Sequence, residues 1–403
     1  MPLLELEEAL AKILATIPPP RTERVPLIES PGRVLAGAIQ SPIDLPAFDN
    51  SAMDGYAVRA IDVGSAKPEA PRRLRLIGKA AAGERFGGEV TAGTCVRLFT
   101  GSPLPRGADA VVMQEDTRAG INAADEVLIL APVAPAENVR RRGEDVEMGV
   151  TLATAGELLT VGRAGLLAAA GLTGVIAGRQ PVVGVLATGS ELKDAGQPLE
   201  PGQIYESNRI TLAALTRRAG AIPKVLPVVT DSLAATRLAL SEAFDQCDAV
   251  VTSGGVSVGD LDFVRGAFEQ IGGEVCFWKV AIRPGRPFVF GRYGEKLLFG
   301  LPGNPVSAFV TFLLMVRPAL LRWQGAVDLS MPMRPGVLAA PLTNPDGRRH
   351  FMRVRIHASG KVDSAGTQGS HVLSSLAASN GLLDLPPGAA LAAGAPVEVM
   401  CWE

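Results

Sequence analysis

The chain has 403 residues, of which 47% are hydrophobic and 20% charged, and its formal net charge at pH 7 is −2. At roughly 100–200 residues per domain this length predicts several domains, and the hydrophobic content argues against a disordered chain. A net charge near zero gives no overall field that would attract nucleic acid or an anionic membrane. Four separated cysteines without CxxC spacing and only three histidines argue against a zinc site, a disulfide framework and histidine-based chemistry.

The N-terminal segment "MPLLELEEALAKIL" is acidic and amphipathic, unlike the basic start and apolar core of a signal peptide. No run of ~18 apolar residues appears, and "AFVTFLLMV" at 308–316 is too short to cross a bilayer. We therefore expect a soluble cytoplasmic protein.

The first half of the chain predicts one helix followed by β-rich structure. Residues 1–17 fit an amphipathic helix that ends at the prolines of 18–20. From about residue 25 to 178, glycine, proline and short β-type runs favour hairpins and loops over long helices. Within this region, 159–178 resembles a small-residue helix that breaks at Gly171.

From residue 180, strands and helices alternate. Strands are predicted at 180–192, 224–231 and 248–253, and helices at 207–220, 232–244 and 260–272. Continuous apolar strands between helices predict a doubly wound, mostly parallel sheet, whose ligands bind at the carboxyl ends of the strands. Residues 331–403 hold short strands and many turns, so a small C-terminal β-domain completes an α/β multidomain protein.

Four polar segments, three of which contain glycine, fall at those strand ends: "ATGSEL", "VVTD", "TSGGVSVGD" and "GLPGNP". The third begins at Ser253, Gly254 and Gly255 and leads to Asp260 and Asp262, although acids would repel a phosphate unless a cation lay between. The alternative is a tight turn followed by an ordinary acidic helix start. Carboxylates at neighbouring strand ends, Glu191 and Asp231 included, are ligands that Mg²⁺ prefers, so a magnesium-bound polyphosphate would explain the pattern.

Two further segments suggest an anion. "GLPGNPVSAF" predicts a helix with Asn304 as its cap and Pro305 at its first position, and a helix N-terminus favours an oxyanion. "FWKVAIRPGRPFVFG" places Lys279, Arg283 and Arg286 around a Pro-Gly turn next to it in the sequence. The alternatives are an ordinary capped helix and a solvated loop, but together the segments favour a polyanion site.

Two polar stretches fit neither a helix nor a strand interior. "FDNSAMDGYAV" carries Asp49 and Asp54, and "RRRGEDV" ends in Glu144 and Asp145. Taken alone, both are typical of turns with solvated charges.

Together the motifs resemble the molybdopterin molybdenumtransferase family, which includes bacterial MoeA and the E domain of gephyrin. The stretches that carry the resemblance, in the family's order, are "PAFDNSAMDGYAVR", "RLFTGSPLPRGADAVVMQE", "NVRRRGEDV", "TGSEL", "GQIYESN", "SGGVSVGDLDF", "FWKVAIRPGRPFVFG", "GLPGNPVSAF" and "QGSH".

The resemblance implies that adenylylated molybdopterin is bound, that its phosphoanhydride is hydrolysed with Mg²⁺ or another divalent cation, and that AMP leaves while molybdate is placed on the dithiolene. It implies an elongated homodimer whose site lies between the doubly wound domain of one subunit and the "FDNSAMDGY" domain of the other. Contacts with the molybdopterin adenylyltransferase and with downstream cofactor-transfer proteins are also implied. The alternatives are an adenylyltransferase, although the chain reads "GGVS" where that enzyme has "GGTG", and a non-catalytic scaffold of the gephyrin type.

Motifs and resemblance together give the expected site residues. The catalytic set is Asp54, Asp145, Glu191, Asp231, Asp262 and Lys279, of which Glu191, Asp231 and Asp262 are the metal ligands. The substrate- and oxyanion-binding set is Thr100, Ser253, Gly254, Gly255, Arg283, Arg286, Pro302, Gly303, Asn304 and Pro305. Arg283 and Arg286 stand where bacterial relatives often have lysine, and Ser190 where some carry an acid.

Four domains are expected. Their predicted ranges are 25–43 with 147–178 (a β-rich linking domain), 44–146 (a mixed β-domain with "FDNSAMDGY"), 1–24 with 179–326 (the doubly wound domain) and 327–403 (a C-terminal barrel-like domain).

Overall fold

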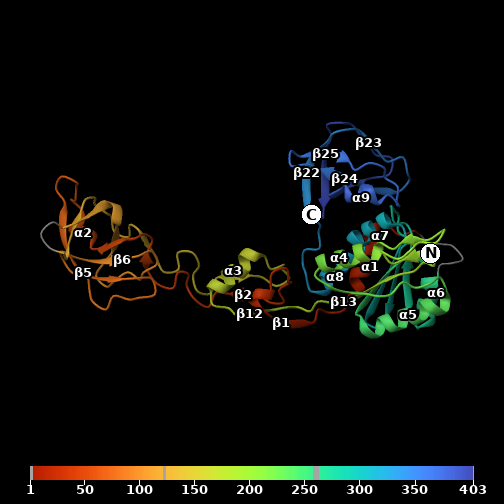
Figure 1. The fold of residues 1–403 in the computed structure, drawn as a ribbon, viewed down its shortest axis with the longest axis horizontal. Coiled ribbons are helices and arrows are strands. Elements are labelled where there is room, and N and C mark those ends of the chain that lie inside the picture. Colours follow the sequence, from red (N-terminus) through yellow and green to blue (C-terminus); the bar gives the residue numbers. More distant parts are fainter. Residues whose placement is uncertain (1–2, 121–123, 257–262, 403) are drawn as a thin grey trace. The chain divides into compact units, whose positions relative to one another are not determined.

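The computed structural model describes residues 3–120, 124–256 and 263–402. The chain divides into two compact units, which are described separately (Figure 1). The first comprises Met1–Gly37, Ala155–Leu159 and Val175–Glu403, and the second Ala38–Thr154 and Thr160–Gly174. The residue boundaries of the four predicted domains remain a prediction.

A six-stranded sheet lies at the centre of the first unit. Its order is β16 (Ile222–Val225), β13 (Val182–Ala187), β17 (Ala249–Ser253), β21 (Lys296–Leu301), β20 (Val289–Tyr293) and β18 (Glu274–Trp278). The first four strands are parallel, and β20 and β18 are antiparallel. The predicted mostly parallel sheet is therefore confirmed.

Helices cover both faces of this sheet (Figure 1). They are α1 (Leu6–Thr16), α4 (Asn208–Arg218), α5 (Leu233–Gln246), α6 (Phe263–Gln270), α7 (Pro305–Thr311), the π-helical η3 (Phe312–Val316) and α8 (Arg317–Trp323). Strand side chains alternate between two hydrophobic clusters: in β17, Val251 packs with residues of α1, α4 and α7, and Val250 with residues of α5 and α6. Burial on both faces explains the continuous apolar strands.

The helical stretch Pro305–Trp323 is long and apolar enough to cross a membrane by length and composition, but 89% of it is buried inside the protein. Its side chains pack against β13, β17 and β21 in the larger hydrophobic cluster. It is therefore a core helix of the α/β sheet.

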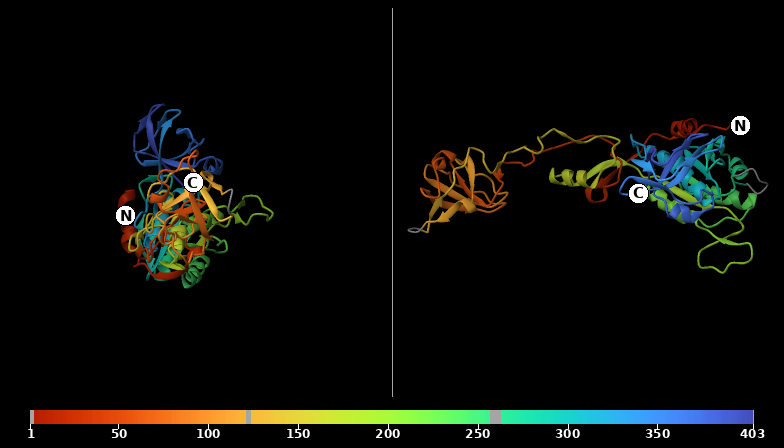
Figure 2. Two further views of the ribbon diagram at one scale, coloured as in Figure 1. Left: turned by 90° about the vertical axis from the view of Figure 1, so that its left-hand side faces the viewer. Right: turned by 90° about the horizontal axis from the view of Figure 1, so that it is seen from above.

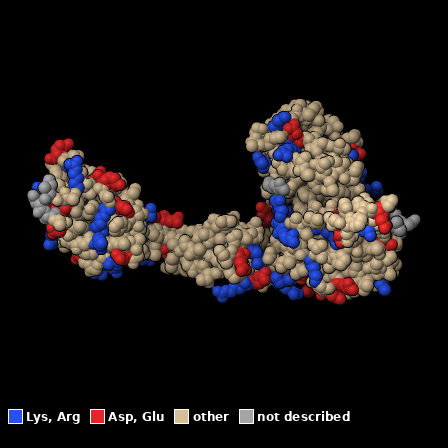
Figure 3. All heavy atoms as spheres, in the orientation of Figure 1, with Lys and Arg blue, Asp and Glu red and all other residues tan. Residues whose placement is uncertain are grey.

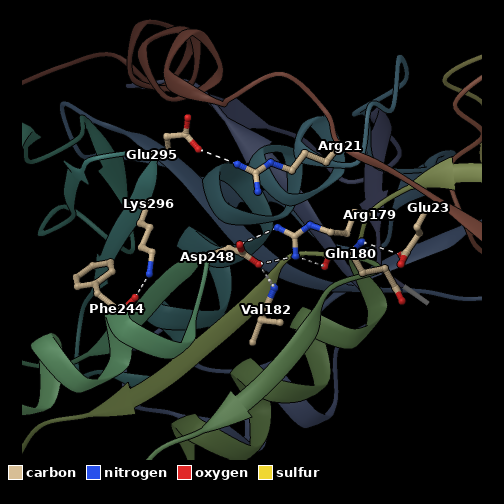
Figure 4. A network of polar contacts seen from close by, with 9 residues as sticks. All are labelled: Arg21, Glu23, Arg179, Gln180, Val182, Phe244, Asp248, Glu295 and Lys296. Carbon is tan, nitrogen blue, oxygen red and sulfur yellow. Dashed lines mark hydrogen bonds and ion pairs between the residues drawn. The ribbon is translucent and has the colours of Figure 1, made fainter.

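The amino ends of the strands are held by charged contacts (Figure 4). Arg179 donates to both carboxylate oxygens of Asp248 at 2.7 and 3.1 Å, and the Val182 N–H donates to the same carboxylate at 2.7 Å. Burial alone would raise the pKa of Asp248, but these hydrogen bonds outweigh it and hold the pKa below its usual value. These contacts fix the chain where it enters β13, at the amino edge of the sheet. The polar segments predicted to bind a ligand lie at the opposite, carboxyl edge.

The C-terminal segment forms a small β-domain in the same unit. Its strands are β22 (Met333–Leu338), β24 (Arg349–Ile356), β25 (Lys361–Ser364), β26 (Gly381–Leu385) and β28 (Pro396–Cys401), with α9 (Leu373–Ala377) and the short pair β23 (Leu342–Thr343) and β27 (Ala390–Leu391). Because β24 also pairs with β26, the strands close into a barrel-like ring. A further strand, β19 (Ile282–Arg283), pairs with β24 and connects this domain to the α/β sheet.

The second unit is built on another six-stranded sheet. Its order is β7 (Ala110–Met113), β4 (Gly55–Val58), β6 (Thr94–Leu98), β5 (Arg72–Ala80), β9 (Glu126–Ile129) and β8 (Thr117–Ala119), with α2 (Ala60–Val63) and η2 (Gln114–Asp116). The remaining strands form short pairs: β3 (Asn50–Ser51) with β10 (Val139–Arg140), and β2 (Ile39–Gln40) with β11 (Thr151–Ala153). The predicted β-rich first half is confirmed.

The helix predicted within 159–178, with a break at Gly171, is confirmed. α3 (Val161–Ala169) ends before Gly171, whose φ of 85° is easily adopted only by glycine. Beyond it the chain forms β12 (Gly174–Gly178), which pairs with β1 (Thr22–Pro26) just before η1 (Leu27–Glu29). On the face shown in Figure 3, basic and acidic side chains are interspersed over both units, in keeping with the small net charge.

Candidate functional site

The four polar segments lie side by side at the carboxyl edge of the α/β sheet. Thr188, directly after β13, pairs with Val229 and donates its N–H to the Ser253 carbonyl at 3.0 Å. The Gly254 N–H donates to the Leu301 carbonyl, also at 3.0 Å. Backbone hydrogen bonds therefore link the ends of neighbouring strands, as a parallel sheet requires.

Asn208 connects two of these segments. Its side-chain Nδ2 donates to the Ser253 hydroxyl at 2.6 Å and to the Gly303 carbonyl at 2.8 Å. Ser207 occupies the N-cap position of α4 without a side-chain cap hydrogen bond, and Asn208 is the first residue of the helix. Sequence alone misses this contact because the "SN" pair is typical of a helix start, which by itself explains both residues.

The glycine-rich segment Ser253–Val256 is packed tightly on the neighbouring strand end. Gly254 and Gly255 have φ angles of 92° and 66°. A Cβ on Gly254 would lie 2.6 Å from the Thr188 carbonyl oxygen, and one on Gly255 would lie 2.7 Å from a Val264 methyl group. Only glycine fits both the backbone conformation and the space. Beside them, the buried Thr188 hydroxyl has no hydrogen-bond partner among the described residues.

Asp231 and Glu191 stand at adjacent strand ends. One Asp231 oxygen accepts the Ser190 N–H at 2.9 Å, and the Asp231 N–H donates to the Ser190 hydroxyl at 3.0 Å. Glu191 is exposed and begins the long loop that carries β14 (Leu192–Lys193) and β15 (Ile204–Tyr205), which extends away from the sheet (Figure 2, yellow-green).

The other two acids of the predicted cluster, Asp260 and Asp262, lie outside the described residues. Within the described ranges no group of three or more His, Cys, Asp or Glu side chains is arranged to hold a metal ion. The three-carboxylate metal site therefore stays a prediction, with two of its members placed.

The three cations around the Pro-Gly turn have different surroundings. The Lys279 ammonium lies over the Trp278 ring, 4.1 Å from its centroid. Arg283 forms an ion pair with Asp346 of the C-terminal β-domain. Arg286 is exposed, and its side chain has no hydrogen-bond or ion-pair partner among the described residues. The turn therefore does not give the three a common protein partner.

The prediction that the Asn304 side chain caps the following helix is wrong. Asn304 occupies the position before α7 and Pro305 the first helical position, as predicted, but Asn304 makes no cap hydrogen bond. Its Nδ2 donates instead to the Ser370 hydroxyl at 3.0 Å, while the Val306 N–H donates to the Ser370 carbonyl at 3.1 Å. Because Ser370 already satisfies the Val306 donor, the "QGSH" segment replaces the local cap. Pro302 and Gly303 complete the turn before it, Pro302 buried and Gly303 exposed.

Asp54 in the second unit is held by Thr100. The backbone N–H and the hydroxyl of Thr100 donate to the same carboxylate oxygen at 2.8 and 2.9 Å. These two hydrogen bonds, with a smaller contribution from the charge of Arg97, lower the pKa of Asp54 from its usual value. Asp54 and Thr100, which the sequence placed in the site separately, thus contact each other. The Asp54 carboxylate stays ionised at neutral pH.

The remaining acids of this unit differ in their contacts. Asp49 accepts the Arg142 N–H at 2.7 Å, which ties the two polar stretches to each other. The Asp145 N–H donates to the Leu45 carbonyl at 3.0 Å, and its carboxylate is exposed to solvent. Asp145 is therefore available to a ligand, whereas Asp49 has a structural contact.

Three family models together match most of the chain. Residues 4–171 match the family model "MoeA N-terminal region (domain I and II)", 184–322 match "Probable molybdopterin binding domain", and 335–402 match "MoeA C-terminal region (domain IV)". The α/β sheet with its four loops thus defines a molybdopterin-binding class of domain, flanked here by two MoeA-type regions.

Full-length relatives narrow this class. Molybdopterin molybdenumtransferase 2 of Mycobacterium tuberculosis is 43% identical over 387 residues, covering 94% of each chain, and the molybdopterin molybdenumtransferase of Haemophilus influenzae is 40% identical, covering 94% of this chain and 93% of the relative. The crystal structure of a molybdopterin biosynthesis MoeA protein from Pyrococcus horikoshii OT3 matches with a TM-score of 0.83 and 34% identity over 100% of both chains. The chain belongs to the molybdopterin molybdenumtransferase family.

Proposed function

We propose that this protein inserts molybdate into adenylylated molybdopterin, with release of AMP, in the biosynthesis of the molybdenum cofactor. The observation that carries the proposal is the single carboxyl edge at which Ser253, Gly303 and Asn208 are joined, close to the Asp231–Ser190 pair. The names of the full-length relatives support the same reaction.

Each part of the site has a proposed role. The Ser253–Gly255 backbone and the turn at Pro302, Gly303, Asn304 and Pro305 form the floor on which the phosphate groups lie. Lys279 and Arg286 supply positive charge to the phosphate groups. Neither side chain is paired with a carboxylate among the described residues, so both charges remain available to the substrate. Asp54, Thr100 and Asp145 are proposed to act in the site of the other subunit of a homodimer, with Asp54 as an ionised hydrogen-bond acceptor.

A divalent cation, Mg²⁺ being the first candidate, fits the donors at the edge. Among the described residues, only one Asp231 oxygen accepts a backbone N–H. The exposed Glu191 carboxylate lies so close to Gly189 that a Cβ on residue 189 would be 2.8 Å from the Glu191 Oε2. Glycine at 189 therefore leaves room for the carboxylate, and hard oxygen ligands are what Mg²⁺ prefers. When bound, the cation would stabilise negative charge on the phosphoanhydride oxygens; Asp262 is the proposed third ligand.

Incubation with adenylylated molybdopterin tests the proposal. We expect AMP to appear only when both Mg²⁺ and molybdate are present, together with a molybdenum-containing pterin. Formation of adenylylated molybdopterin from ATP would instead indicate an adenylyltransferase. Substrate binding without any AMP release under all conditions would indicate a scaffold and overturn the transferase.

We further propose a cytoplasmic homodimer that receives its substrate from the molybdopterin adenylyltransferase and delivers its product to cofactor-transfer proteins. If each site takes residues from both subunits, Asp54→Ala and Asp231→Ala subunits should recover activity when mixed as heterodimers. Verified heterodimers without recovered AMP release would contradict a shared site.

A further inference from the structure

Trp278, at the end of β18, contacts two parts of the proposed site. Its indole Nε1–H donates to the Val256 carbonyl at 3.1 Å, so it is bound to the end of the glycine-rich segment. The Lys279 ammonium lies 4.1 Å from the centroid of its ring. The Arg265 guanidinium of α6 lies 5.5 Å from the same centroid. One half-buried side chain thus connects the segment that follows β17 with the cation that follows β18.

The backbone of Lys279 is held in an unusual conformation. Its φ of 79° is in the left-handed region, which non-glycine residues rarely adopt and keep only where the surroundings fix them. The Lys279 N–H donates to the Phe288 carbonyl at 2.9 Å, and its carbonyl accepts the Leu4 N–H at 3.4 Å. Lys279 is therefore fixed at both ends, by backbone hydrogen bonds and by the Trp278 ring.

An aromatic ring holds a cation in a different way from a carboxylate. A carboxylate partner would neutralise the ammonium, whereas the face of an indole attracts it through the ring quadrupole and leaves its charge intact. Among the described residues Lys279 has no acidic partner within ion-pair distance. Its ammonium is consequently ordered and still available to an anion.

We propose that Trp278 is a positioning residue that fixes the Lys279 ammonium relative to Ser253–Val256, so that a phosphate bound on this segment meets an ordered cation. The inference rests on the proposed function, because it takes the ligand of the glycine-rich segment to be a phosphate group of the substrate. Trp278 touches no reacting atom; it acts through Lys279 and through the Val256 carbonyl.

The kinetic test compares two substitutions that separate the two contacts. Trp278→Phe keeps a ring under Lys279 but removes the hydrogen bond to Val256, and Trp278→Leu removes both. We expect kcat for AMP release to fall severalfold in the first and more than about tenfold in the second, with KM changed by less than kcat. Trp402→Phe, at another half-buried tryptophan, is the matched control and should keep the wild-type kcat. A folded Trp278→Leu protein with wild-type kcat would overturn the proposal.

A second measurement does not depend on activity. In protein carrying Trp323→Phe and Trp402→Phe, Trp278 is the single tryptophan, and its ¹⁵N-labelled indole gives one NMR signal. Adding Lys279→Ala should shift this signal, and AMP should shift it more in the protein that retains Lys279. An indole signal unaffected by Lys279→Ala would overturn the positioning contact. If the wild type releases no AMP, the proposed function fails, and this signal still decides the inference about Trp278.

Discussion

Ser190 and Asp231 hold each other across two neighbouring strand ends: the Ser190 N–H donates to the Asp231 carboxylate at 2.9 Å, and the Asp231 N–H donates to the Ser190 hydroxyl at 3.0 Å. The pair fixes one carboxylate oxygen and leaves the other without a bond to the described residues. Serine at 190 therefore orients the Asp231 carboxylate.

Asp231→Asn should separate charge from structure at this pair. The amide oxygen can still accept the Ser190 N–H, so we expect little change in thermal stability, whereas the proposed metal ligand is lost. Losing several kcal/mol of charge stabilisation lowers Mg²⁺-dependent AMP release by about 100-fold or more. The control is Asp245→Asn, at an exposed acid of α5. Wild-type rates in the Asp231 variant would remove Asp231 from the metal site.

Thr100→Val tests the cause of the Asp54 pKa. The substitution removes the hydroxyl donor and keeps the backbone N–H, so the pKa of Asp54 should rise part of the way toward its usual value. A carboxylate with a lowered pKa loses its hydrogen bonds as pH falls through that pKa. The local structure around Asp54 should therefore persist to a lower pH in the wild type than in the Thr100→Val variant. Carboxyl ¹³C NMR against pH measures both, with Thr151→Val as the control. An Asp54 titration identical in the variant and the wild type would exclude the hydroxyl as a cause.

The alternation of strands and helices between residues 180 and 272 was predictable from sequence, because strands buried on both faces have a continuous apolar composition. The strands β18, β20 and β21 of the same sheet were not among those predicted. The carboxyl edge followed from the alternation. Contacts between segments distant in sequence were not predictable: Asn304 binds Ser370, 66 residues further on, and this contact replaced a cap that was locally plausible. Asn208 likewise joins two strand ends only once α4 is packed on the sheet. The deciding partners lie in other elements, which local patterns do not encode.

His350 should make the protein less stable in mild acid. It is 2% exposed on β24, and neither ring nitrogen has a partner among the described residues. Burial, and next the charge of Arg283, lowers its pKa from 6.5 to about 4; Asp346 opposes this shift, while Arg353 and Arg348 add to it. Since the unfolded chain binds the proton first, stability is complete above pH 6.5 and falls as pH drops toward 4.

Between pH 7 and pH 5 this difference amounts to about 2 kcal/mol of unfolding free energy. Urea unfolding at the two pH values measures it. His350→Leu should remove most of the loss, and His371→Gln, at an exposed histidine, should not. An equal loss in the His350 variant would place the acid sensitivity elsewhere.

Arg283 and Arg286 should respond differently to substitution, although the sequence suggested the same role for both. Arg286 is exposed without a partner among the described residues, so Arg286→Ala should remove a charge-assisted hydrogen bond to the substrate phosphate or to molybdate. Such a bond is worth roughly 1.5–3 kcal/mol, or about ten- to a hundredfold in affinity, and Arg286→Lys should restore part of it.

Arg283 is already paired with Asp346 across β19 and the C-terminal β-domain, and both side chains are partly exposed. Arg283→Ala should therefore cost no more than about 1 kcal/mol of stability and leave the molybdate requirement nearly unchanged. Asp346→Asn should have a similar effect, and the double variant should lose less than the sum of the two, because the pair is broken only once. AMP release against molybdate concentration, with urea unfolding alongside, tests both residues. If Arg283→Ala raises the molybdate requirement and Asp346→Asn does not, then Arg283 binds the anion itself and its pairing with Asp346 is incidental.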